Sequence, residues 1–158
     1  MKKALDVKHI NPFLQSSLNI FESMVQMKLQ VGKPAVGTLK FDNRIFIIQV
    51  GVTGEMKGQV LLVMSVERAK EIASRMMGGM PVAELDELSR SALGELCNMI
   101  MGSTATLFSS QGILIDITPP LSLLGSKLTL QADIQSIRVP LLTEGEEFIN
   151  IYICVSQE

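Results

Sequence analysis

Four residues near the middle of the chain have types and spacings that could form a polar site on one helix. They are Ser91, Glu95, Asn98 and Gly102, within the stretch SRSALGELCNMIMGS. At about 100° per residue they fall on one narrow stripe, with successive members one turn apart. A carboxylate and an amide placed in this way could contact the same external molecule. The spacing therefore predicts a site that faces outward rather than one buried in the core.

The same pattern is also what an ordinary amphipathic helix needs on its solvated side, and this alternative stays open on spacing alone. Asn98 is a poor residue for a helix interior, and Gly94 and Gly102 each cost up to about 1 kcal/mol relative to Ala. Local penalties and little bulk on the exposed side favour close approach by another molecule. The opposite side of the helix is apolar and is predicted to face the core through Ala92, Leu93, Leu96, Met99, Ile100 and Leu107.

Three helices are predicted to carry or support this stripe. The principal helix runs over 88–108, after an acidic segment that suits the positive end of a helix dipole. An earlier helix is predicted to begin at Asn11-Pro12 and to end near Gly32. A middle helix starts at Val66 and is predicted to stop at Gly78-Gly79.

Strand patterns follow the first and the principal helix. Residues 35–43, 44–54 and 58–65 predict an antiparallel meander, and the later strands are predicted in 113–120, 126–136, 137–143 and 147–156. The last of these could complete the sheet or lie at its edge. We therefore predict an α/β fold of the α+β type, with a mostly antiparallel sheet packed on long helices. Residues 1–158 are predicted to form one domain of two similar helix-then-strands halves.

Composition narrows the possible partners and compartments. The chain has 158 residues, 47% of them hydrophobic and 19% charged, with a formal net charge of -2. The basic residues are scattered and the pI is near 5.5, so we predict neither nucleic acid nor an anionic membrane as a partner. No run reaches the 18 or so apolar residues of a spanning helix. Cys97 and Cys154 are predicted to be buried reduced thiols, which fits the cytoplasm.

The polar stripe resembles the hallmark of the CheC and CheX class of bacterial chemotaxis phosphatases. That hallmark is Ser or Asp, three residues, Glu, two residues, Asn, and a proline about twenty residues later. Ser91, Glu95 and Asn98 match it, and DITPP supplies Pro119 and Pro120, about one residue short of the expected register. The segments INPFL, MMGG and ITPP also look like CheX members, so the resemblance covers nearly the whole chain.

The first half of the chain lacks the polar pair. CheC members carry Glu and Asn in both halves. If Ser17 is the counterpart of Ser91, the equivalent positions here are Phe21 and Met24. Neither side chain can do the polar chemistry, and this asymmetry resembles CheX.

The resemblance implies a phosphatase that hydrolyses the aspartyl phosphate of a phosphorylated CheY-type response regulator. Asn98 would position the attacking water without adding charge, and Glu95 would pair with the lysine that regulators keep beside their phosphorylated aspartate. It further implies partner-binding positions, no metal ligands on this chain, Mg²⁺ on the regulator, and a homodimer whose sheets join. The partner-binding positions are Ser91, Gly102, Pro119 and Pro120. The alternative is a module of the same fold that binds a regulator or a flagellar-switch protein without catalysis.

Three further features receive structural interpretations. His9 has no neighbouring triad residues and is predicted to lie on the surface. The segment GVTGEMKG lacks the glycine order of a nucleotide loop and is predicted to be a hairpin turn. Most of the ten methionines are predicted to fill the core.

Overall fold

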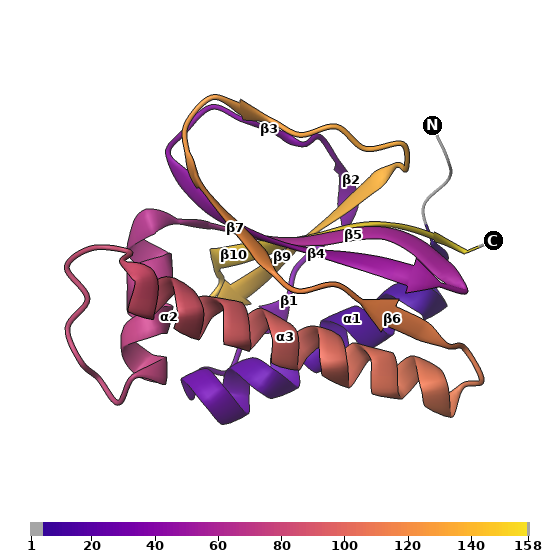
Figure 1. The fold of residues 1–158 in the computed structure, drawn as a ribbon, viewed down its shortest axis with the longest axis horizontal. Helices are drawn as coiled ribbons and strands as arrows, with labels where there is room; N and C mark the ends of the chain where they lie inside the picture. Colours follow the sequence, from indigo (N-terminus) through magenta and orange to yellow (C-terminus); the bar gives the residue numbers. More distant parts are fainter. Residues whose placement is uncertain (1–4, 158) are drawn as a thin grey trace.

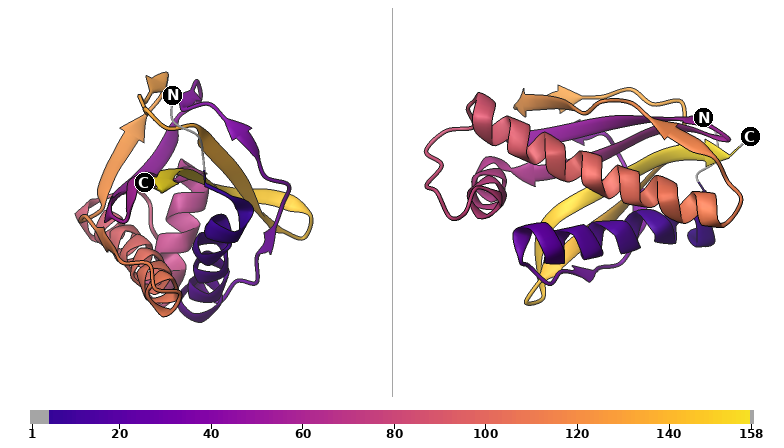
Figure 2. Two further views of the ribbon diagram at one scale, coloured as in Figure 1. Left: turned by 90° about the vertical axis from the view of Figure 1, so that its right-hand side faces the viewer. Right: turned by 60° about the horizontal axis from the view of Figure 1, so that its bottom comes forward.

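The computed structural model describes residues 5–157, and three helices cover one face of its sheet (Figure 1, Figure 2). Helix α1 spans Val7–Ile20 and continues into η1, a π-helical turn over Phe21–Val25. Helix α2 spans Val66–Met76, and the long α3 spans Glu87–Ser110. Helices α1 and α3 pack side by side beneath the sheet. Among residues 5–157, no helix is long and apolar enough to cross a membrane.

The main sheet is antiparallel and mixes strands from both halves of the sequence. Its strand order is β1-β9-β10-β5-β4-β6, with β2 also paired to β9 and β7 also paired to β4. The short strands β3 and β8 form a separate two-stranded ribbon, which arches over the face opposite the helices (Figure 1). The strands are β1 Gln30–Val31, β2 Ala35–Gly37, β3 Lys40–Phe41, β4 Ile45–Gly54, β5 Met56–Ser65, β6 Ile115–Ile117, β7 Leu121–Gly125, β8 Leu128–Thr129, β9 Ser136–Thr143 and β10 Glu146–Gln157.

The strand pairing of the sheet has an internal two-fold symmetry that relates β1–β5 to β6–β10. Exchanging β1–β5 for β6–β10 in order reproduces every pairing: β1 and β2 pair with β9, as β6 and β7 pair with β4. The hairpins β4-β5 and β9-β10 meet at the central pair of β5 and β10. The predicted order of a helix followed by strands therefore occurs twice, and each half completes its edge with short strands from the other.

Two hydrophobic cores result, one on each face of the sheet. The larger lies between the sheet and the helices, where Phe13, Phe21 and Leu93 are fully buried against Ile48 and Val50. The smaller lies under the β3-β8 ribbon. Its buried members are Leu39, Ile47, Leu61, Val63, Tyr152 and Cys154. Alternating residues of β4 and β5 supply both cores, because successive side chains of a strand point to opposite faces.

The first helix differs from its predicted bounds at both ends. Asp6 is the N-cap residue, so the helix starts before the Asn-Pro pair and holds Pro12 in its interior. Pro12 has no N–H to donate there, but its ring is buried in the core. The helix ends at Val25, because Gln26 adopts the left-handed conformation with φ 59°. The predicted continuation towards Gly32 was wrong.

The helices α2 and α3 lie close to their predicted bounds. The Ser65 hydroxyl caps α2 by accepting a hydrogen bond from the Arg68 N–H at 3.1 Å. Gly78 and Gly79 both have positive φ, 71° and 87°, which confirms a glycine stop after α2.

Two strand predictions need correction, and one alternative that the sequence left open is decided. The antiparallel hairpin of β4 and β5 is confirmed, but β2 pairs with β9, so the predicted meander over 35–65 is wrong for its first strand. Strand β7 was not predicted, and 126–136 contains only the short β8 and the first residue of β9. The terminal strand β10 has β5 and β9 on its two sides and is central rather than an edge. Short strands paired over long sequence separations give weak local signals.

Burial tests the predictions for the cysteines and for His9, and the strand bounds test the predicted hairpin turn. Cys97 and Cys154 are buried and free, as predicted. His9 is half-buried on α1, with its ring 6.4 Å from that of Phe108, so it lies at the surface but is less exposed than predicted. The segment 51–58 is the β4-β5 hairpin and its turn, as predicted.

Candidate functional site

The candidate site lies on α3, whose first turn is held by a capping residue. The Asp86 carboxylate accepts hydrogen bonds from the Ser89 N–H at 2.9 Å and from the Ser89 hydroxyl at 2.8 Å. These bonds lower the pKa of Asp86, because they favour the charged carboxylate. Arg90 donates to the Leu85 carbonyl at 3.0 Å. The start of the helix, and with it the rotation of every later side chain, is thereby fixed.

The buried side of α3 is broader than the sequence pattern predicted. Eight side chains are buried, and they include two polar ones with partners: Ser89 bonds to the capping Asp86, and the Thr104 hydroxyl donates to the Ile100 carbonyl at 2.8 Å. Burial raises the pKa of the Cys97 thiol to about 12. Three residues that were predicted to face the core are only half-buried: Ala92, Met99 and Leu107. The buried set is Ser89, Leu93, Leu96, Cys97, Ile100, Met101, Thr104 and Phe108.

The opposite side presents the polar stripe that the sequence predicted. Ser91 and Glu95 are exposed, while Asn98 and Gly102 are half-buried. Within residues 5–157, no hydrogen bond or ion pair engages the Glu95 carboxylate or the Asn98 amide. Both polar groups can therefore interact with an external molecule without first breaking an internal bond.

Pro120 forms a wall beside the stripe. A Cβ added to Gly94 would lie 3.5 Å from the Pro120 Cγ, so the proline ring packs on the helix at its glycine. Thr118 holds the segment that leads to Pro120 through two hydrogen bonds with Gly51. The Thr118 hydroxyl accepts a hydrogen bond from the Gly51 N–H at 2.8 Å, and the Thr118 N–H donates to the Gly51 carbonyl at 3.0 Å. Pro119 is exposed and Pro120 is half-buried. The structure thus brings Pro120 to the helix that carries Glu95 and Asn98.

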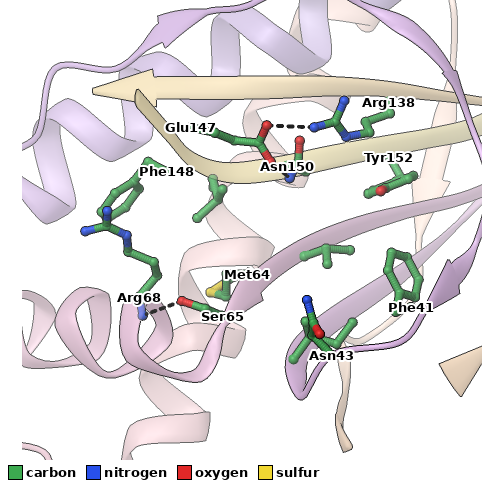
Figure 3. Close-up of a pocket in the computed structure, with 13 residues that line it drawn as sticks. Phe41, Asn43, Met64, Ser65, Arg68, Arg138, Glu147, Phe148, Asn150 and Tyr152 are labelled. Atoms are coloured by element: carbon green, nitrogen blue, oxygen red, sulfur yellow. Dashed lines mark hydrogen bonds and ion pairs between the residues drawn. The ribbon is translucent and has the colours of Figure 1, made fainter. Parts of the chain in front are cut away.

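A hollow of about 420 Å³ lies away from the α3 stripe and is shown in Figure 3. Its two arginines already have partners. Arg138 pairs with Glu147 at 2.7 Å, and Arg68 lies over the Phe148 ring at 4.7 Å. Since these cations are engaged, the hollow offers less unpaired polar chemistry than the α3 stripe. Among residues 5–157, no three His, Cys, Asp or Glu side chains gather in a way that could hold a metal ion.

Comparisons with known proteins identify the family. A family model described as Chemotaxis phosphatase CheX matches residues 46–142. The CheY-P phosphatase CheX of Thermotoga maritima is 30% identical over 152 residues, which cover 96% of this chain and 97% of that protein. This chain belongs to the CheX family of chemotaxis phosphatases.

Solved structures agree with this membership of the CheX family. The CheC-like superfamily protein from Shewanella sp. PV-4 is 30% identical, with a TM-score of 0.82, over 96% of this chain and 99% of that chain. The fold is also shared with CheX in the CheX-CheY-BeF₃-Mg²⁺ complex from Borrelia burgdorferi. That chain has a TM-score of 0.81 and 23% identity, over 96% of this chain and all of that chain. The α+β fold expected from the resemblance is therefore confirmed.

As expected of a CheX-family chain, the Glu-Asn pair occurs on α3 but not on α1. The residues of α1 that correspond to this pair are not the predicted Phe21 and Met24. Ser91 is exposed, but Ser17 is fully buried and donates to the Phe13 carbonyl at 2.7 Å. Ser17 thus resembles Thr104, which makes the same bond one turn back along α3. In that register Lys8 stands in place of Glu95, and Asn11 in place of Asn98. Helix α1 has the amide without the carboxylate.

Two residues near the CheX-family site were missed by sequence reasoning. Leu88 is exposed in the first turn of α3, and its helical angle lies within about 20° of that of Glu95. The same angular count that found the stripe could have found it. Thr118 supports Pro120 through Gly51, 67 residues away in the sequence. No local signal reveals a partner at that distance.

Proposed function

We propose that this CheX-family chain hydrolyses the aspartyl phosphate of a phosphorylated CheY-type response regulator, with Asn98 and Glu95 as its catalytic residues. Family membership supports the reaction, since the Thermotoga maritima relative is a CheY-P phosphatase. The observation that carries the assignment of residues is the exposed stripe of α3. There the two polar groups stand one turn apart with no partner among residues 5–157.

Asn98 is proposed to position the attacking water. Phosphoryl transfer passes through a loose transition state, so the water must be held in line with the leaving oxygen more than it must be deprotonated. A neutral amide oxygen accepts a hydrogen bond from that water without repelling the phosphoryl oxygens. The half-buried position of Asn98 limits its motion, which suits a positioning role.

Glu95 is proposed to pair with the lysine beside the phosphorylated aspartate of the regulator. A carboxylate placed directly against the phosphoryl group would be repelled, whereas one turn away from Asn98 it can meet that cation. Glu95 is exposed, so its carboxylate can be reached by a partner. The contact with the lysine would hold the regulator in the orientation that Asn98 requires.

Four more residues are proposed to contact the regulator. Ser91 and Gly102 leave little bulk at the two ends of the pair, so a partner surface can approach the helix closely. Pro120 supplies a rigid wall that its contact with Gly94 holds in place. Pro119 is the exposed neighbour of that wall. Small and rigid side chains lose little conformational entropy when a partner binds.

The Mg²⁺ ion is proposed to belong to the regulator. CheX of Borrelia burgdorferi is known in a complex with CheY, BeF₃ and Mg²⁺. A metal on the partner would neutralise charge on the phosphoryl oxygens. The residues of this chain would then only position the water and make the docking contacts. The regulator's own ligands would then decide the affinity for the ion.

We also propose one domain over residues 1–158, a cytoplasmic location and a homodimer. Because β10 is paired on both sides, a sheet that continues across two subunits would have to use an outer edge of the sheet. The edge strands β1 and β2, or β6 and β7, are the candidates.

The test is phosphate release from a phosphorylated CheY-type regulator encoded in the same genome. We expect the native chain to accelerate release, and Asn98→Ala and Glu95→Ala to lose most of that acceleration. The control is Ser110→Ala, which changes an exposed residue of α3 that lies off the stripe, about 18 Å along the helix from Asn98. If the native chain binds regulators without accelerating release from any of them, the chain is a binding module and the catalytic proposal is wrong.

A further inference from the structure

An apolar hollow of about 370 Å³ lies at the N-terminal end of α3, between its first turn and the loop from α2. Two large apolar side chains beside it are exposed: Leu88 by 62% and Met80 by 56%. Soluble proteins seldom gather such side chains on a surface without a use for them. The apolar lining of the hollow is formed by Met77, Met80, Pro81, Val82, Ala83 and Leu88.

Leu88 lies on the same exposed stripe as the proposed catalytic pair. It precedes Glu95 by seven residues, which is about two turns and roughly 10 Å along the helix axis. Because Asp86 and Ser89 hold the first turn of α3, Leu88 is fixed relative to Glu95. The hollow therefore continues the proposed regulator-binding face rather than forming a separate surface.

A partner that docks on Glu95 and Asn98 must contact more than these two residues. Specific protein interfaces bury about 800 Å² on each partner, and a few desolvated apolar anchors carry most of their binding energy. Towards its C-terminal end the stripe offers only the small residues Gly102, Thr106 and Ser109. Towards its N-terminal end it offers Leu88 and the hollow, so the apolar anchor lies on that side.

The rim of the hollow adds a charge preference. Glu84, Asp86 and Glu87 are exposed around Leu88, and Glu95 follows two turns later. Like charges crowded along one face favour a partner with basic groups on the facing surface. Met80 has an unbranched side chain that can adapt its shape to the group that enters.

We propose that the hollow beside Leu88 and Met80 binds one apolar side chain of the response regulator, flanked on the regulator by basic residues. The inference rests on the proposed function, since it extends the same docking face. It separates the tasks along α3: the hollow supplies most of the binding energy, Glu95 orients the bound regulator, and Asn98 positions the water. Loss of the anchor should therefore weaken binding and leave the bound complex active.

The test uses a CheY-type regulator from the same genome, loaded with Mg²⁺ and beryllofluoride in place of the phosphoryl group. Its Kd for the full chain is measured for the native protein, Leu88→Ser and Met80→Ser. Turnover of the phosphorylated regulator is measured in parallel. We expect Leu88→Ser to raise Kd about tenfold or more, with kcat at saturation nearly unchanged. Asn98→Ala should show the opposite pattern, with kcat lost and Kd retained.

The matched control is Leu114→Ser, which removes a leucine that is 65% exposed beyond the other end of α3. It should leave Kd at the native value. If Leu88→Ser binds like the native chain, the anchor proposal is wrong while the proposed function stands. If the native chain binds no regulator, both fall; if it binds through Leu88 without turnover, only the catalytic proposal falls. Circular dichroism verifies that each variant is folded.

Discussion

Pro120 packs on Gly94, and this contact joins the segment after β6 to the helix that carries the polar stripe. A Cβ on Gly94 would lie 3.5 Å from the Pro120 Cγ, which is an ordinary van der Waals separation. Space therefore does not require glycine at this position. The glycine instead lowers the helix propensity of α3 next to the candidate site.

Gly94→Ala is expected to stabilise the fold by about 0.5–1 kcal/mol, because alanine gains helix propensity and its methyl group fits against the proline. Urea unfolding measures the change. Phosphatase activity should stay near the native level, since the added methyl faces Pro120 and not Asn98. A loss of stability would show that the ring lies closer to the helix than the 3.5 Å contact indicates.

Gly102→Ala should raise the stability of the fold and weaken regulator binding. Nothing lies within 4 Å of a Cβ at this position, so the substitution should stabilise α3 by a similar amount, about 0.5–1 kcal/mol. The new methyl group would stand on the exposed stripe, one turn beyond Asn98. We expect weaker regulator binding despite the higher melting temperature. Equal binding by the variant would remove Gly102 from the docking face.

Asn98→Asp tests whether the amide must be uncharged. The two side chains have nearly the same shape, so stability should change little at this half-buried position. A carboxylate would repel the phosphoryl oxygens and misplace the water, and we expect catalysed release to fall by on the order of 10²-fold. Single-turnover kinetics with saturating CheX-family protein measure this step. Native rates in the variant would assign water positioning to another residue.

Gly58→Ala should be the most damaging glycine substitution in the sheet. Its φ is +146°, and a Cβ would come within 2.0 Å of the Cys154 carbonyl oxygen on the neighbouring central strand. We expect a loss of about 3 kcal/mol or more, measured by chemical unfolding. Gly112→Ala is the matched control, because φ is +81° there but nothing lies within 4 Å of its Cβ. The control should lose only about 1 kcal/mol.

Cys97 should make stability fall at high pH. Burial raises its pKa from 9.0 to about 12, so the folded chain keeps the thiol proton that the unfolded chain releases above pH 9. Its contribution is fully present below pH 9 and is lost as the pH rises from about 9 to 12. Between pH 8 and 10 this amounts to about 1 kcal/mol. Urea unfolding of Cys97→Ala should show a smaller decline over that range than the native chain.

Features set by local sequence were predictable from the residues alone. The apolar period and the capping Asp86 define α3, and the same period places Ser91, Glu95 and Asn98 on its exposed side. Helix α2 between Ser65 and the Gly78-Gly79 pair was equally readable. In each case the determining interactions span one or two turns, so the sequence pattern contains them.

From the sequence we could predict α2, α3, the β4-β5 hairpin and the residue types of the polar stripe. The folded structure was needed to show that β2 pairs with β9, that Pro12 lies inside α1, and that Pro120 packs on Gly94. These features depend on pairing and packing between segments far apart in the chain, and short strands have little propensity of their own to reveal them. The polar stripe of α3 is specified by local sequence, whereas the position of Pro120 beside it depends on the pairing of β4 with β6 and on the hydrogen bond from Gly51 to Thr118.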